Sequence, residues 1–75
     1  MKLVKIEWVD ANFSDGWVSK TKARTHQLAQ CTTVGFVVKK NFKQITVAQS
    51  ISNDNSFDSI MSIPIKCVKS IKDIQ

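Results

Sequence analysis

Apolar and polar residues alternate with a period of two in short runs along most of the chain, and this pattern limits the fold more than any other feature. In the first run, Val4, Ile6 and Trp8 alternate with Lys5 and Glu7. Successive side chains of a β-strand point to opposite faces, so this run predicts a strand with one buried face.

Four further runs follow, separated by polar segments. The expected strands are residues 3–9, 34–39, 45–51, 60–63 and 68–74. Residues 40–43 predict a hairpin turn, and the entirely polar residues 52–56 predict a loop. Pro64 has no N–H to donate and should end the fourth strand. The spacing of three between Ile65 and Val68 favours a 3₁₀ or helical turn before the last strand.

Residues 19–30 form the only segment with helical character, with Ser19 or Thr21 as its N-cap. Their apolar side chains are few, so we expect one or two turns. The chain has 75 residues, enough for a single domain over 1–75. The predicted fold is mostly β: a small five-stranded SH3-like or Sm-like barrel with one short helical segment, and with Trp8 and Phe36 in its core.

Two cysteines, Cys31 and Cys67, lie far apart in the sequence. Disulfide-stabilised domains of this size usually contain four or more, so we expect reduced thiols, although a bridge would form if the two residues were adjacent. The chain opens without an apolar leader and has no run long enough to span a membrane. These features indicate a cytoplasmic protein.

Catalytic and metal-binding patterns are weak. His26 is the only histidine, and its separation from Cys31 does not enforce a nucleophile–base pair. With Cys67, these residues give three soft ligands, whereas structural zinc sites use four. The two glycines are isolated, so there is no glycine-rich phosphate loop. We therefore expect neither an enzyme nor a bound cofactor or metal.

A binding surface is better supported, because Phe13, Phe42 and Phe57 fall in polar segments where a ring either caps the barrel or meets a partner. Lysines next to aromatic rings are typical of single-stranded nucleic-acid binders. The candidate surface comprises Asp10, Phe13, Trp17, Lys20, Lys22, Arg24, Lys39, Lys40, Phe42, Lys43 and Phe57. The net charge of +5 favours anionic partners. The alternative is a solvated lysine-rich surface that reflects an AT-rich genome.

Four segments of the sequence together resemble small proteins of tailed bacteriophages and prophages. The features that this chain has in common with those proteins are a Trp–aliphatic–Asp strand, a Thr–Val–Gly strand start and a terminal Ile–Pro element. The segments are residues 5–11, 31–38, 45–52 and 63–71. Similar proteins tend to have a basic residue directly after the proline, where this chain has Ile65. The resemblance implies a phage accessory protein in the cytoplasm of the bacterial host, and it implies no enzymatic activity.

Three functions fit these observations. The first is an accessory protein that binds a host or phage protein, or further copies of itself, through loops and strand edges. The second is a nucleic-acid-binding barrel. The third is a counter-defence protein that sequesters a nucleotide signal in a basic pocket between subunits.

Overall fold

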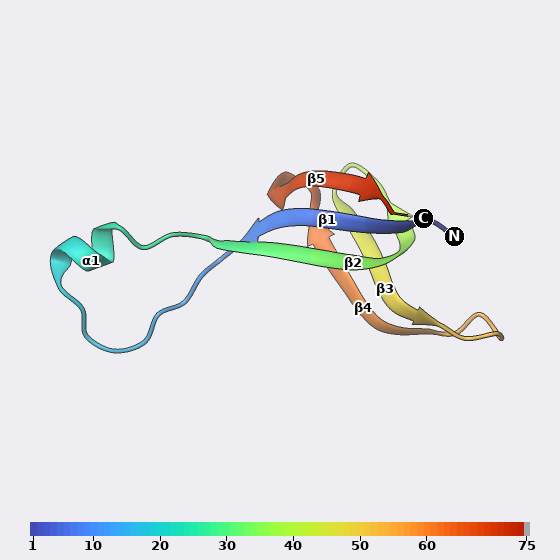
Figure 1. Ribbon diagram of the computed structural model, residues 1–75, viewed down its shortest axis with the longest axis horizontal. Helices are drawn as coiled ribbons and strands as arrows, with labels where there is room; N and C mark the ends of the chain where they lie inside the picture. The colour runs from blue at the N-terminus through green and yellow to red at the C-terminus, as the bar shows by residue number, and fades with distance from the viewer. Residues whose placement is uncertain (75) are drawn as a thin grey trace.

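The computed structural model describes residues 1–74, which form one antiparallel sheet of five strands in the order β4-β3-β2-β1-β5 (Figure 1). The strands are β1 (Leu3–Asp10), β2 (Ala29–Lys40), β3 (Gln44–Ile51), β4 (Phe57–Pro64) and β5 (Val68–Asp73). A short helix, α1 (Lys20–Arg24), lies between β1 and β2, and a 3₁₀ turn, η1 (Ile65–Cys67), precedes β5. The predictions of a mostly β chain, of one short helical segment and of a 3₁₀ turn are confirmed.

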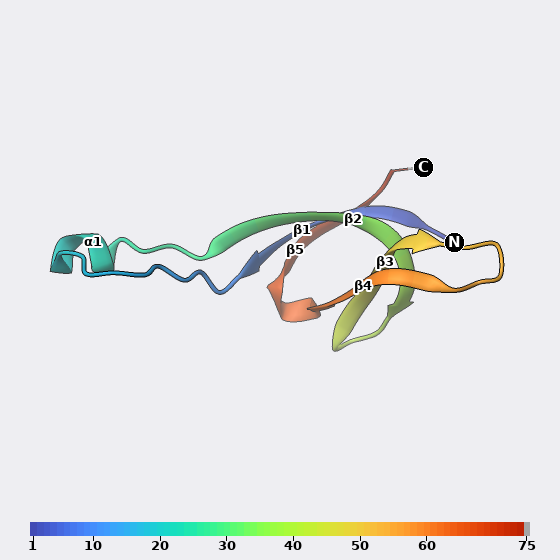
Figure 2. The same ribbon diagram turned by 90° about the horizontal axis from the view of Figure 1, so that it is seen from below.

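The expected barrel closure is wrong, because β4 and β5 are the two edges of an open sheet. Pro64 ends β4, and η1 redirects the chain so that β5 pairs with β1 instead of β4. The Ile65 amide donates to the carbonyl oxygen of Lys43 (2.9 Å), which holds this change of direction against the β2–β3 turn. Figure 2 shows that β2 curves from the layer of β1 towards β3 and β4. Within residues 1–74, no ladder joins β4 to β5.

The core lies on the inner face of this curved sheet. Its fully buried members come from three strands: Val4 and Ile6 of β1, Ile45 and Val47 of β3, and Ile63 of β4. The ladders place Val47 opposite Met61 and Ile45 opposite Ile63, so the inner face continues onto β4. Apolar burial on this face is the main stabilising term, at about 25 cal/mol per Å².

The register of β1 and β2 decides which residues of β2 face the core. Val4 pairs with Gly35, whereas Phe36 pairs with Leu3 and is therefore on the opposite face. The prediction that Phe36 lies in the core is therefore wrong: its side chain lies on the opposite face of the sheet and is only partly buried. Trp8 does pack against the core, and its Nε1 donates to Oγ1 of Thr33 (3.0 Å).

The molecule is elongated because residues 11–28, between β1 and β2, project away from the sheet (Figure 1). Its extents are 52 × 22 × 22 Å and its radius of gyration is 15.8 Å, whereas a compact domain of this length has about 11 Å. Within residues 1–74, no helix combines the length and the apolar character needed to cross a membrane.

The β3–β4 loop, at the end of the sheet remote from these residues, is held by a carboxylate. Asp54 accepts hydrogen bonds from the hydroxyl of Ser52 and from the amide of Ser56, and the Ser52 amide donates to the Ser56 carbonyl (2.9 Å). Asn55 adopts a positive φ of 66° at the tip, a conformation that asparagine tolerates better than most residues. The polar loop expected over residues 52–56 is therefore confirmed.

Adding a side chain at Gly35 should destabilise the sheet. A Cβ there would lie 2.9 Å from the carbonyl oxygen of Ala48 and 3.0 Å from Cβ of Val47. We expect Gly35→Val to lower the free energy of unfolding by about 1–3 kcal/mol through overpacking. The neighbouring exposed substitution Val34→Thr should change it by less than about 0.5 kcal/mol. Urea denaturation checks both values, and equal effects of the two substitutions would contradict the close approach.

The carboxylate of Asp54 in the β3–β4 loop should make the stability of the fold depend on pH in the acid range. Hydrogen bonds from Ser52 and then Ser56 lower the pKa of Asp54 below its ordinary value of 3.8. The ionised Asp54 carboxylate therefore contributes fully to the stability of the folded state above its unfolded-state pKa. This contribution is lost as the pH falls through its folded-state pKa. We expect Asp54→Asn to be less stable than the wild type at neutral pH, with the difference shrinking between about pH 5 and about pH 2. Urea unfolding across this range checks it, and a widening difference would contradict it.

Candidate functional site

The segment of residues 11–28, here called the arm, has every residue exposed to solvent. Trp17 is 104% exposed and Phe13 is 86% exposed, so neither ring contributes to the core. Val18 and Leu28 are also exposed apolar residues of the arm. Water-exposed aromatic rings forgo the free energy of burial, so the composition of the arm is that of a binding interface.

Local hydrogen bonds give the arm its shape. Ser19 is the N-cap of α1, and its hydroxyl accepts a hydrogen bond from the Lys22 amide (3.2 Å). Gly16 turns the chain before the helix with a φ of 87°, a value that favours glycine. The Nδ2 group of Asn12 donates to the carbonyl oxygen of Gln27 (3.0 Å), which links the outgoing and returning segments of the arm.

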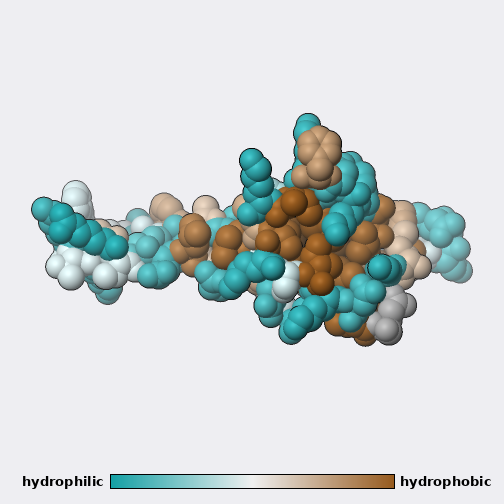
Figure 3. All heavy atoms as spheres, turned by 90° about the horizontal axis from the view of Figure 1, so that it is seen from above, coloured by the Kyte–Doolittle hydropathy of each residue, from teal (hydrophilic) through white to brown (hydrophobic). Residues whose placement is uncertain are grey.

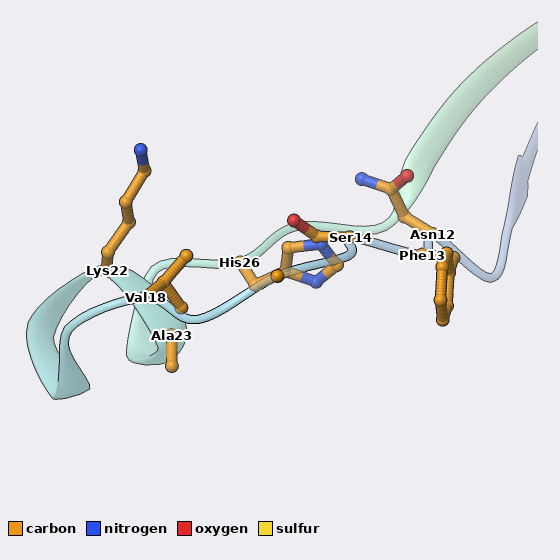
Figure 4. A pocket seen from close by; sticks show the side chains of 8 residues that line it. Asn12, Phe13, Ser14, Val18, Lys22, Ala23 and His26 are labelled. Carbon is orange, nitrogen blue, oxygen red and sulfur yellow. The ribbon is translucent and has the colours of Figure 1, made fainter.

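A hollow of about 410 Å³ lies between these two halves of the arm (Figure 4). Apolar side chains of Phe13, Val18 and Ala23 line it together with the basic side chain of Lys22 and the ring of His26. Figure 4 shows Val18 close to Ala23, with the Lys22 ammonium pointing outward. Apolar lining next to a cation suits an apolar side chain flanked by a carboxylate.

The far end of the arm is basic. α1 contains Lys20, Lys22 and Arg24, whereas Asp15 is the only carboxylate of the arm. Figure 3 shows that hydrophobic residues gather over the sheet on this face, while the end of the arm is mostly hydrophilic. The predicted residues Phe13, Trp17, Lys20, Lys22 and Arg24 are therefore brought together in one projecting element.

The second group of predicted residues forms the β2–β3 turn, away from the arm (Figure 2). Oδ1 of Asn41 accepts hydrogen bonds from the amides of Lys43 (2.9 Å) and Gln44 (3.0 Å), which fixes the turn. Phe42 is 85% exposed, with Nζ of Lys43 6.0 Å from its ring centroid. Lys39 and Lys40 end β2 beside them. We call these four residues, Lys39, Lys40, Phe42 and Lys43, the basic turn.

Two predicted site residues belong to neither group. Asp10 ends β1, and its carboxylate accepts a hydrogen bond from the Ala11 amide (2.8 Å), so it fixes the start of the arm. Phe57 was expected in a polar loop, and this expectation is wrong. It begins β4, pairs with Ile51 and is partly buried, because β4 starts earlier than the sequence pattern predicted.

Cys31 and Cys67 are both free and partly buried. Across residues 1–74, no group of three histidine, cysteine or acidic side chains gathers in a geometry that would hold a metal ion.

The sequence interpretation missed four apolar residues. Val18 and Ala23 line the hollow of the arm, and their only sequence signal is their position next to Trp17 and within the short helix. Ile60 and Met61 on β4 are 58% and 42% exposed although they lie in a predicted strand. No protein-family model, curated protein or solved structure matches the chain.

Truncating the aromatic rings of the arm should leave the stability of the fold unchanged. Because the rings of Phe13 and Trp17 are almost fully exposed, we expect Phe13→Ala and Trp17→Ala each to change the free energy of unfolding by less than about 0.5 kcal/mol. The core substitution Ile6→Ala should cost about 2–5 kcal/mol. Urea denaturation followed by circular dichroism checks the contrast, and a large loss in the Trp17 variant would show that the ring packs within its own chain.

Proposed function

We propose that this chain is a non-catalytic, phage-encoded accessory protein that acts in the bacterial cytoplasm by binding a host or phage protein through its arm. The observation that carries the proposal is the full exposure of Trp17, with Phe13 and Val18 nearby, on a segment whose residues are all outside the core. Tryptophan is among the residues that most often dominate the binding energy of protein interfaces.

The surface area of the chain supports a binding role. The accessible surface is 5916 Å², whereas a compact monomer of this mass exposes about 4,600 Å². A standard protein interface buries about 800 Å² on each partner. The arm therefore offers enough additional surface for a specific complex.

We further propose that the scaffold is an SH3-like variant whose sheet remains open. Five antiparallel strands with a 3₁₀ turn directly before the last strand support this assignment. In this scaffold the long connection between the first two strands is the arm, so the rigid sheet supplies a base and the arm supplies the contact.

A second candidate function is binding of single-stranded nucleic acid at the basic turn. The observation in its favour is the exposed ring of Phe42 among Lys39, Lys40 and Lys43, which offers a stacking surface next to cations. This candidate uses a different part of the molecule, so substitutions separate it from the first.

Binding of the protein partner should depend on Trp17. We expect the purified, immobilised chain to capture a discrete protein from nuclease-treated lysate of the bacterial host. Trp17→Ala should weaken this capture by about 30-fold or more, the loss that removal of a central interface tryptophan produces. Quantitative mass spectrometry of the eluates measures the retained protein.

The matched control is Phe42→Ala, which removes another exposed aromatic ring, from the basic turn, and should leave the capture unchanged. Two results would contradict the proposal: capture that is insensitive to Trp17→Ala, or binding of labelled oligonucleotides that falls steeply with salt and is lost in Phe42→Ala. The second result would favour the nucleic-acid function instead.

A further inference from the structure

We propose that the arm also binds a second copy of this chain, docking on the β3–β4 hairpin of that copy in a reciprocal, two-fold dimer. This inference rests on the proposed role of the arm as a protein-binding element and names one partner for it. The hairpin here means β3, the loop of residues 52–56, and β4.

The hairpin offers an exposed apolar surface. A shallow hollow on the sheet is lined by Thr33, Val47, Gln49, Ser59, Ile60 and Met61. Val47 is buried and lies at the bottom of this hollow. Ile60 and Met61, which also line it, are exposed to solvent. The apolar residues of the arm, Trp17 and Val18, are chemically matched to this surface, since both sides gain by leaving water.

Charge complementarity identifies the hairpin as the matching surface. Between Lys43 and Lys66 the only charged side chains are Asp54 and Asp58, so the hairpin is acidic in a chain of net charge +5. Neither carboxylate forms an ion pair with another residue of the described chain. The end of the arm has the opposite charge, from Lys20, Lys22 and Arg24. An apolar pair flanked by opposite charges fixes the orientation of docking.

The shape of the molecule allows both contacts to form together. The arm and the β3–β4 loop lie at opposite ends of the long axis (Figure 1). Two copies placed side by side in antiparallel orientation bring each arm over the hairpin of the other. Such an isologous arrangement closes on itself and uses the same pair of surfaces twice.

The positive charge of α1 would then face Asp58, whose carboxylate is exposed and accepts only a weak hydrogen bond from the Ser59 hydroxyl (3.3 Å). Asp54 is bonded to Ser52 and Ser56 and shapes the loop. Asp58 is therefore the residue whose charge can be changed without disturbing the hairpin.

Sedimentation equilibrium of the nuclease-treated protein, over a range of concentrations, tests the dimer. We expect Trp17→Ala to raise the dimer dissociation constant by about 30-fold or more. Lys22→Glu and Asp58→Lys should each raise it by about 3-fold to 10-fold, because each places like charges together twice in a two-fold dimer. The combined Lys22→Glu/Asp58→Lys chain should recover most of the wild-type affinity.

Phe42→Ala and Lys43→Glu are the matched controls in the basic turn and should leave the dissociation constant unchanged. Circular dichroism confirms that each variant is folded. A chain that remains monomeric at all concentrations, a dimer insensitive to Trp17→Ala, or a failure of the combined chain to recover affinity would overturn the proposal. A mass increase that is seen only without nuclease treatment would do so as well, because bound nucleic acid, and not a second copy of the chain, would then account for it.

These outcomes separate the inference from the proposed function. If the protein is monomeric while Trp17→Ala still abolishes capture of a host protein, only the dimer is wrong. If Trp17→Ala alters neither measurement, the arm is not a protein-binding element and the proposed function fails too.

Discussion

The close approach of β3 to Gly35 is the constraint on which the rest of the sheet depends. Gly35 is buried in the middle of the longest strand and pairs with Val4 of β1, while the backbone of Ala48 passes over the position where a side chain would begin. This contact lets β2 curve, so that Val47 packs against residues of β1 that a flat sheet would hold at a distance.

Despite this curvature, β4 and β5 remain the two edges of an open sheet, and the arm lies outside the core. The buried residues all lie in the sheet, and the β1–β2 connection adds surface without adding burial. Segments with few buried contacts have low local stability. The arm is therefore the part of the molecule that a partner can reshape most easily, and its shape in the free chain rests on the cap at Ser19 and the Asn12–Gln27 hydrogen bond.

The distribution of charge gives the molecule two distinct ends. The basic end of the arm and the acidic β3–β4 hairpin lie at opposite ends of the long axis, and the basic turn is a third, separate feature. An acidic or apolar protein surface suits the arm, whereas phosphate groups suit the basic turn. Because the three surfaces do not overlap, single substitutions can assign a partner to one of them.

The sequence by itself determined the strand pattern, the two turns and the 3₁₀ element, because these depend on residues close together in the chain. It left open whether Phe13 and Phe42 cover the sheet or face solvent, and the structure shows both rings exposed. It also indicated a basic, aromatic binding surface. Only the tertiary structure decided that the sheet stays open and that Phe36 faces away from Val4, because register and closure depend on pairing between distant segments. The tertiary structure also decided that the candidate surface is divided into the arm and the separate basic turn. Alternation of apolar and polar residues indicates a strand, but it does not show where the segments after each strand lie relative to one another.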